Sequence, residues 1–284
     1  MTSLRHTGLG ALAILSWGTL GALGAYSASL PPYLVLTLCF AIAAGLGLVI
    51  CAATGKVPAS PLTRSVWVFA ALLAAYHLAY LEAFHHAAPI PVSLINYLWP
   101  ACLIILGNAF FNLSSGWRGY AGAALGFLGV AVLIGGNGIS LQSSEAVGYA
   151  LAFLGAVLWA LFSNLRRVEM LDSVASLTTI CAGASLFCGV LWVAHGAIWT
   201  ELDTYHVLTI LGLGLGPAGG AFFLWDLGMR YGQAAFLSVL GYSAPVFSTL
   251  LMLLLGMGTA SWQLVAAIAL ITLGGTVVHG GSRT

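Results

Sequence analysis

The residues best suited to bind a small molecule lie in the short segment from Ser93 to Pro100, which reads SLINYLWP. This segment belongs to an apolar run, 91–111, that holds no charged residue. On a helix Ser93, Asn96, Tyr97 and Pro100 fall at positions i, i+3, i+4 and i+7 and share one face. Hydroxyl and amide groups donate and accept hydrogen bonds, and Pro100 weakens the helix because it removes a backbone hydrogen bond. The pattern favours a path for a substrate, with a packing face that tolerates a proline as the alternative.

A second candidate group lies in the run 66–87, where His77, Tyr80 and Phe84 share a helix face and Tyr76 lies at its edge. A buried histidine is either a hydrogen-bonded structural group or a proton carrier. Burial of an ionisable group in lipid is costly, which favours a functional role. His77 and Tyr80 are therefore predicted to bind substrate, together with four further residues whose side chains are aromatic or polar: Trp17, Trp99, Trp159 and Ser163.

Small residues surround several of these positions. Trp17 has glycine and alanine neighbours on its helix face, which leave room for either another helix or a planar ligand. Close helix packing through glycine is the commoner reason for such neighbours in membranes. The pair Gly122 and Gly126 is interpreted in the same way, as a site of helix packing.

The composition identifies the elements that must hold these residues. Of 284 residues, 61% are hydrophobic and 5% are charged, and a soluble chain of this length cannot keep such a surface in water. Repeated apolar runs of about 18 residues or more are expected to span a membrane. We predict an all-α polytopic membrane protein with ten transmembrane helices, at roughly 8–27, 32–53, 66–87, 91–111, 118–136, 147–165, 173–194, 205–225, 233–255 and 261–280.

The distribution of charge predicts the orientation of these helices. All eight basic residues lie at the termini or in the even-numbered loops: Arg5, Lys56, Arg64, Arg118, Arg166, Arg167, Arg230 and Arg283. The odd-numbered loops have none and carry Glu145, Glu201 and Asp203 instead. Because basic residues are retained on the cytoplasmic side, we expect both termini in the cytoplasm.

Residue types also recur at a constant offset of 145 positions. The recurring pairs are Ser93 and Ser238, Tyr97 and Tyr242, Pro100 and Pro245, Trp117 and Trp262, and Gly129 and Gly274. Each half, 1–140 and 141–284, then has five spans, and an odd number inserts the second half upside down. We predict two inverted five-helix repeats around a central cavity, with Ser238 and Tyr242 on the wall opposite Tyr97. Pro100 and Pro245 are predicted as hinges.

Several classes of function are excluded or disfavoured. The sequence has no Gly-x-x-x-x-Gly-Lys-Ser/Thr motif and only one lysine, Lys56, which excludes a P-loop ATPase. No paired acidic cluster or His-Glu-x-x-His motif indicates an intramembrane enzyme, so no catalytic residue, metal or cofactor is expected. The dispersed basic residues do not form a nucleic-acid surface. The expected partners are a small-molecule substrate and membrane lipid, and a non-transporting scaffold is a further alternative.

Nearly the whole chain resembles the drug/metabolite transporter superfamily, EamA branch. The resemblance rests on the ten-span repeat plan, on Trp17-Gly18, on Trp159 followed by Arg166 and Arg167, and on the segment from Ser93 to Pro100. That segment is similar to the aromatic amino acid exporters of the superfamily. The resemblance implies a ten-helix basket that exports aromatic amino acids and related compounds across a bacterial inner membrane. Export of drugs or lipophilic cations is the alternative within the same superfamily.

Overall fold

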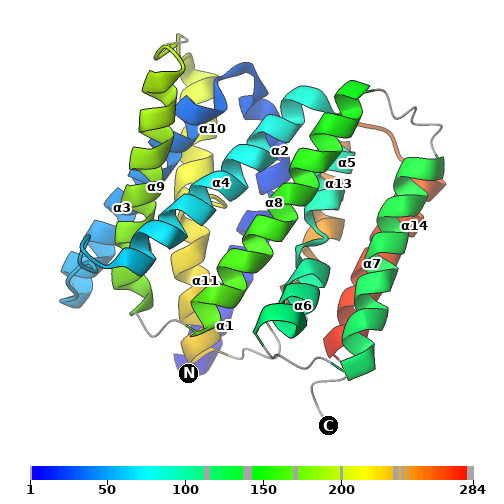
Figure 1. Ribbon diagram of the computed structural model, residues 1–284, viewed down its shortest axis with the longest axis horizontal. Coiled ribbons are helices and arrows are strands. Elements are labelled where there is room, and N and C mark those ends of the chain that lie inside the picture. Colours follow the sequence, from blue (N-terminus) through cyan, green and yellow to red (C-terminus); the bar gives the residue numbers. More distant parts are fainter. Residues whose placement is uncertain are drawn as a thin grey trace.

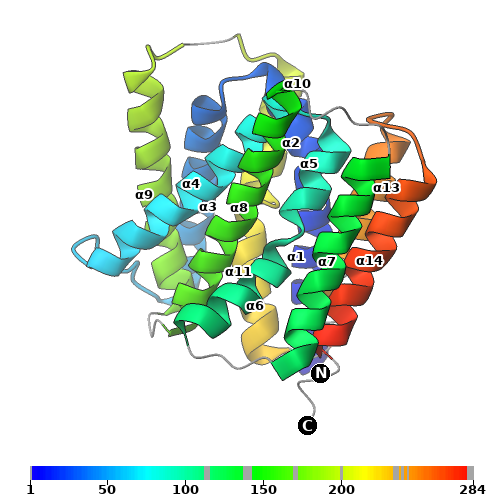
Figure 2. The same ribbon diagram turned by 45° about the vertical axis from the view of Figure 1, so that its right-hand side comes forward.

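The computed structural model describes residues 2–111, 116–136, 143–168, 172–198, 201–232, 237, 240–241 and 243–279. Every regular element in these ranges is helical (Figure 1, Figure 2). The helices of the first half are α1 (Thr2–Gly18), α2 (Leu20–Tyr26), η1 (Ser27–Ser29), α3 (Pro32–Thr54), α4 (Arg64–His86), α5 (Pro89–Asn96), α6 (Trp99–Phe110) and α7 (Gly116–Gly136). Those of the second half are α8 (Ser143–Val168), α9 (Ser173–Ala194), α10 (Thr204–Leu215), α11 (Gly220–Tyr231), α13 (Ala244–Leu254) and α14 (Trp262–His279).

Seven stretches of the described chain are long and apolar enough to cross a membrane. They are Leu4–Ser29, Pro32–Thr54, Arg64–His86, Pro89–Phe110, Glu145–Arg166, Val174–Ala194 and Thr204–Trp225. These stretches coincide with seven of the ten predicted runs to within a few residues. The runs 118–136 and 261–280 correspond to α7 and α14, and the described part of the run 233–255 contains α13. The chain is therefore an all-helical, multi-pass membrane protein.

Three predicted spans are interrupted where one continuous helix was expected. In the run 8–27, Thr19 separates α1 from α2. The run 91–111 is divided into α5 and α6 by Tyr97 and Leu98, so Pro100 lies in the first turn of α6 and not in the middle of a kinked helix. A proline is tolerated in the first turn, where its missing N–H has no intrahelical partner. The run 205–225 is divided by the turn Gly216–Gly219, and α11 then continues to Tyr231. Pro217 lies in that turn and cannot continue the helix.

The helices pack in long-range pairs. α3 packs along α9, α4 along α8, α1 along α11 and α7 along α14. Figures 1 and 2 both show α7 and α14 side by side at one edge of the molecule. Their contact is close and antiparallel: a Cβ atom added at Gly274 would lie 2.5 Å from the Gly122 carbonyl oxygen, and one added at Gly129 would lie 2.9 Å from that of Ala267.

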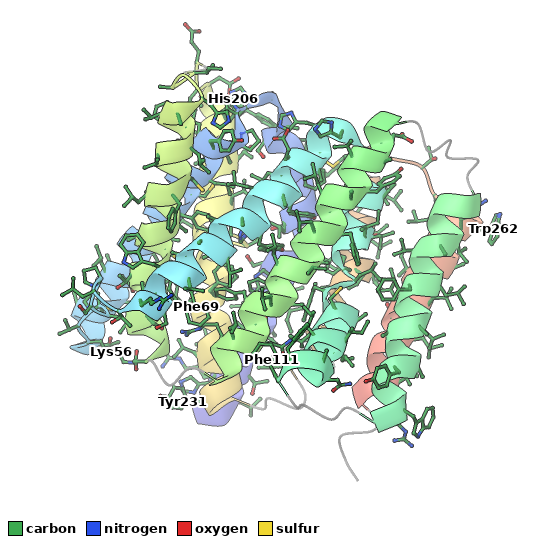
Figure 3. All side chains as sticks on the ribbon, viewed as in Figure 1. Lys56, Phe69, Phe111, His206, Tyr231 and Trp262 are labelled. Atoms are coloured by element: carbon green, nitrogen blue, oxygen red, sulfur yellow. The ribbon has the colours of Figure 1, made fainter. Side chains whose placement is uncertain are left out.

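Figures 1 and 3 show which residues lie at each end of the helix bundle. The N-terminal end of α1 and the C-terminal end of α14 lie at the same end (Figure 1). Lys56, Phe111 and Tyr231 also lie toward this end, whereas His206 and Trp262 lie at the other (Figure 3). At the first end the Lys56 ammonium pairs with Asp172 at 2.9 Å, which joins the loop after α3 to the start of α9.

Candidate functional site

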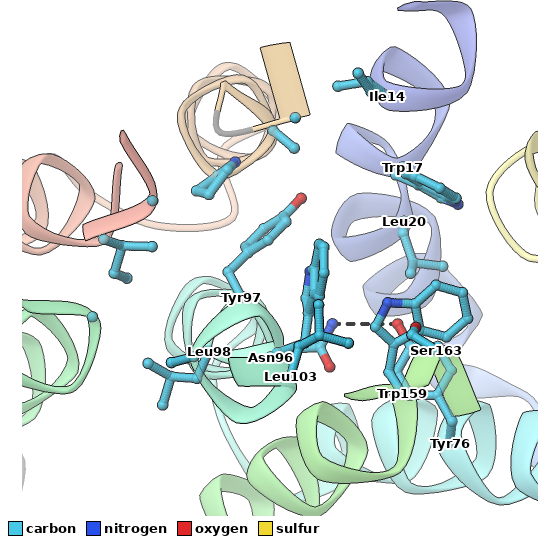
Figure 4. Close-up of a pocket in the computed structure, with 18 of the residues that line it drawn as sticks. Ile14, Trp17, Leu20, Tyr76, Asn96, Tyr97, Leu98, Leu103, Trp159 and Ser163 are labelled. Atoms are coloured by element: carbon cyan, nitrogen blue, oxygen red, sulfur yellow. Dashed lines mark hydrogen bonds between the residues drawn. The ribbon is translucent and has the colours of Figure 1, made fainter. Parts of the chain in front are cut away.

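A cavity of about 420 Å³ lies between the two halves of the chain, within the range of about 300–1,000 Å³ typical of small-molecule sites. Helices α1, α4, α8 and α11 form one wall, and α7 and α14 form another. The break between α5 and α6 projects side chains between these walls (Figure 4). The cavity thus lies where residues distant in the sequence meet.

Aromatic rings form most of the first wall. Trp159 lies at the centre of this group, with its ring centroid 5.2 Å from that of Tyr76, 5.6 Å from that of Phe222 and 6.3 Å from that of Trp17. Trp17 in turn lies 5.2 Å from Trp225. Separations of 4.5–7 Å are those at which aromatic pairs attract, and an aromatic ligand would be held in the same way.

Two buried polar side chains interrupt this wall and retain unpaired atoms. The Asn96 amide nitrogen donates to the Tyr76 hydroxyl at 3.4 Å (Figure 4), while its Oδ1 has no partner among the described residues. His77 Nδ1 lies 2.9 Å from the Leu73 carbonyl oxygen. Since a carbonyl only accepts, Nδ1 carries a hydrogen, and Nε2 is left without a partner in the described chain. Buried polar atoms are normally paired, so these two are available to a ligand.

Ser93 and Tyr97 do not share one polar helix face with Asn96, although the sequence pattern predicted that they would. Because the helix breaks at Tyr97, its side chain points away from Asn96 and into another part of the cavity (Figure 4). There it packs against Ile14 and Ala244. Ser93 is not part of the cavity wall; its hydroxyl lies 3.3 Å from that of Ser248, at a junction of α5 with α13 and α2.

Most of the predicted site residues meet at this cavity. Its wall includes Trp17, His77, Tyr80, Asn96, Tyr97, Trp99, Trp159, Ser163 and Pro245. Ser238 and Tyr242 lie outside the described residues, as does the side chain of Pro100. No Asp, Glu, Lys or Arg is found among the described residues that line the cavity, so the polar groups described there carry no fixed charge.

The sequence interpretation missed Phe222 and Trp225, which line the cavity from α11. The 145-residue repeat could have indicated both residues. Phe222 lies 145 positions after His77, and Trp225 lies 145 positions after Tyr80. These pairs differ in residue type, so a search for identical residues passes over them.

Comparison with known proteins supports a transporter. Residues 7–135 match the EamA-like transporter family. The aromatic amino acid exporter YddG of Ancylobacter novellus is 35% identical over 98% of both chains. The exporters of the same name from Salmonella typhimurium and Escherichia coli are 27% and 26% identical, over 90% and 88% of each chain.

A solved crystal structure also has the same fold. It is 30% identical in sequence, covers 96% of both chains and superimposes with a TM-score of 0.74. The likeness in sequence and the likeness in structure thus extend over nearly the whole chain, including both walls of the cavity. The chain belongs to the EamA-like transporter family.

Proposed function

We propose that this protein exports aromatic amino acids, namely phenylalanine, tryptophan and tyrosine, and similar small amphipathic compounds across the bacterial inner membrane. The observation that carries the proposal is the cavity, in which uncharged polar groups interrupt an aromatic wall. The names of the relatives in three bacteria, all aromatic amino acid exporters, support the same substrate class.

The cavity offers partners for the aromatic ring and for the ammonium group of such a substrate. The aromatic ring packs among Trp17, Tyr76 and Trp159, where ring contacts are worth about 0.5–1.5 kcal/mol each beyond burial. The ammonium group is a donor, and Asn96 Oδ1 and His77 Nε2 are buried acceptors without a partner in the described chain. Aromatic faces also attract the ammonium. None of these contacts involves a fixed charge, so binding is weak enough for release.

The proposed architecture is ten transmembrane helices in two inverted five-helix repeats, 1–140 and 141–284. Two contacts between α7 and α14 support it. Gly129 approaches Ala267, and Gly122 approaches Gly274. Adding 145 to the residue numbers 122 and 129 gives 267 and 274, so the repeat exchanges the first contact for the second. Inverted repeats of this kind allow alternating access to a site near the membrane midplane.

The proposed orientation has both termini in the cytoplasm. The eight basic residues occupy only the termini and the even-numbered loops, and basic residues of short loops remain on the cytoplasmic side. The position of the first and last helix ends at one end of the bundle supports an even number of spans (Figure 1). Export then runs from the end that holds Lys56 to the end that holds His206 (Figure 3).

Export of a lipophilic cation is a second candidate, because the same aromatic faces attract a cation. The unpaired amide oxygen of Asn96 and the absence of a carboxylate from the described cavity wall favour an amino acid over a permanent cation. A cation deep in the membrane normally requires a paired charge.

Counterflow into proteoliposomes tests both candidates. Vesicles loaded with unlabelled phenylalanine should accumulate labelled phenylalanine or tryptophan from outside. Excess unlabelled aromatic amino acid should compete, while serine and glutamate should not. Competition by a lipophilic cation alone would support the second candidate. Absence of counterflow with every substrate would leave a non-transporting scaffold.

A further inference from the structure

The α7 wall contains two kinds of glycine. Gly129 is a packing position, because an added Cβ would lie 2.9 Å from the Ala267 carbonyl oxygen of α14. Gly126, in the same helix, has no such neighbour. Among the described residues, the only atom within 4 Å of an added Cβ is Cδ2 of Leu98, at an ordinary contact distance of 3.5 Å. The backbones of Gly122 and Gly126 both pack against α14, since a Cβ added at Gly274 would lie 2.5 Å from the Gly122 carbonyl oxygen and 3.3 Å from the Gly126 nitrogen. The position that a Gly126 side chain would take, however, faces away from that contact.

The space beside Gly126 is the cavity itself. Gly126 is buried and lines the cavity, as does Leu98. With Leu98 as its one near neighbour among the described residues, a Cβ added at Gly126 would project into the cavity that the aromatic wall also lines. A side chain at residue 126 would thus occupy part of the cavity and reduce the space for a ligand.

Two further features show that this cavity offers polar atoms to a ligand. Asn96 is 5% exposed and His77 is 1% exposed, and both line the same cavity with one polar atom unpaired in the described chain. Empty cavities in proteins are apolar, whereas unpaired polar atoms require a partner.

The geometry points to Gly126 as a specificity-determining residue: the missing side chain sets the largest aromatic side chain that the cavity accepts. This inference rests on the proposed function, which supplies the aromatic substrate. One methylene in an apolar pocket changes discrimination about 10- to 200-fold. A larger side chain at residue 126 should therefore reduce tryptophan transport more than phenylalanine transport.

Two variants of graded size test the size limit in proteoliposomes. Gly126→Ala and Gly126→Val should lower the ratio of tryptophan to phenylalanine counterflow, by about 10-fold or more for the larger side chain. Alanine improves helix propensity over glycine, so Gly126→Ala should fold. Gly45→Ala and Gly45→Val are the matched controls, since Gly45 is an exposed glycine of α3 with no atom within 4 Å of an added Cβ and no part in the cavity. The ratio in the controls should equal that of the parent.

The outcomes distinguish a failure of the proposed function from a failure of the size limit at Gly126. No counterflow in the parent overturns the proposed function. Counterflow in the parent with an unchanged ratio in both Gly126 variants overturns the size limit alone. An equal loss of both substrates in Gly126→Val also overturns it, unless Leu98→Ala in the same chain, which removes the facing side chain, restores tryptophan counterflow.

Alkylation gives a readout that does not require transport. The thiol in Gly126→Cys should react with a maleimide more slowly in the presence of tryptophan, and glycine should give no such protection. The parent supplies the background, since its five cysteines are all buried: Cys39, Cys51, Cys102, Cys181 and Cys188. A rate that tryptophan leaves unchanged would place the ligand elsewhere and overturn the inference.

Discussion

Trp17 and Trp159 meet edge to face in the cavity wall, with ring centroids 6.3 Å apart and ring planes at 71°. They come from the first and sixth predicted spans and lie 142 positions apart. This separation is three residues short of the 145-residue repeat, so the two rings match only with a three-residue shift between the proposed repeats. Their meeting places an indole from each half in one wall, where the proposed aromatic substrate would contact both halves at once.

Replacing either indole should weaken the binding of aromatic substrates. One aromatic contact is worth about 0.5–1.5 kcal/mol beyond burial, so Trp17→Ala and Trp159→Ala should each raise the concentration for half-maximal phenylalanine counterflow about 2- to 12-fold. Trp117→Ala is the control, because Trp117 is 73% exposed at the start of α7. A value equal to that of the parent in both cavity variants would place the ring elsewhere.

Asn96 should contribute to recognition of the amino-acid group and not of the ring. Hydrogen bonds to charged groups are worth about 1.5–3 kcal/mol, so Asn96→Ala should reduce phenylalanine affinity about 10- to 150-fold. Competition by an aromatic compound without an amino group should change little. Asn164→Ala is matched, since buried Asn164 donates to the Leu103 carbonyl at 3.0 Å and does not line the cavity. Equal loss for both compounds would assign Asn96 a structural role.

His77 should act as a hydrogen-bonding wall group. Glutamine can donate to the Leu73 carbonyl as His77 Nδ1 does, so His77→Gln should keep both counterflow and the response of export to a pH gradient. The measurement compares labelled tryptophan flux with and without an imposed gradient. Loss of the gradient response with counterflow intact would instead make His77 the proton carrier.

The membrane dictates most of what could be predicted of the fold. A bilayer requires charge-free runs of a fixed length, so the predicted run 173–194 and the helix Ser173–Ala194 agree to the residue. Breaks within a run are harder to predict, because they depend on the surrounding helices. Pro217 lies in a glycine-rich stretch that hydropathy reads as one span, yet the chain turns there between α10 and α11.

The residue types that line the site could be predicted from the sequence, but the directions in which their side chains point were harder to predict. Aromatic and polar residues in uncharged runs proved to line one cavity. Helical periodicity placed Ser93 on the same face as Asn96, but it could not foresee that Ser248 approaches Ser93 from α13. A contact between the two halves, such as that of Ser93 with Ser248, cannot be predicted from the residue spacing within one half.

The orientation can be tested by labelling from outside the cell. Ser29 is exposed at the end of η1, so the thiol in Ser29→Cys should react with a membrane-impermeant maleimide added to intact cells. The thiol in Lys56→Cys should react only after lysis, and a reporter fused after Thr284 should read as cytoplasmic. An external C-terminal reporter would contradict the even number of spans.

Pro100 and Pro245 occupy equivalent places, since each is the second residue of its helix, in α6 and α13. A proline in the first turn keeps the preceding residues from continuing the helix. We expect these positions to act as hinges when access alternates between the two ends of the cavity. Pro100→Ala and Pro245→Ala should therefore slow counterflow while leaving substrate protection against thermal unfolding unchanged.

The hinge test needs a proline that differs only in its location. Pro32 also lies in the first turn of a helix, α3, but it does not line the cavity. Pro32→Ala should carry substrate at the rate of the parent, because it removes the same ring constraint without affecting the broken span. If Pro100→Ala and Pro245→Ala match Pro32→Ala in rate, both prolines serve packing alone. Slowing confined to Pro100→Ala and Pro245→Ala, with purification and unfolding temperature unchanged, identifies these two prolines as moving parts.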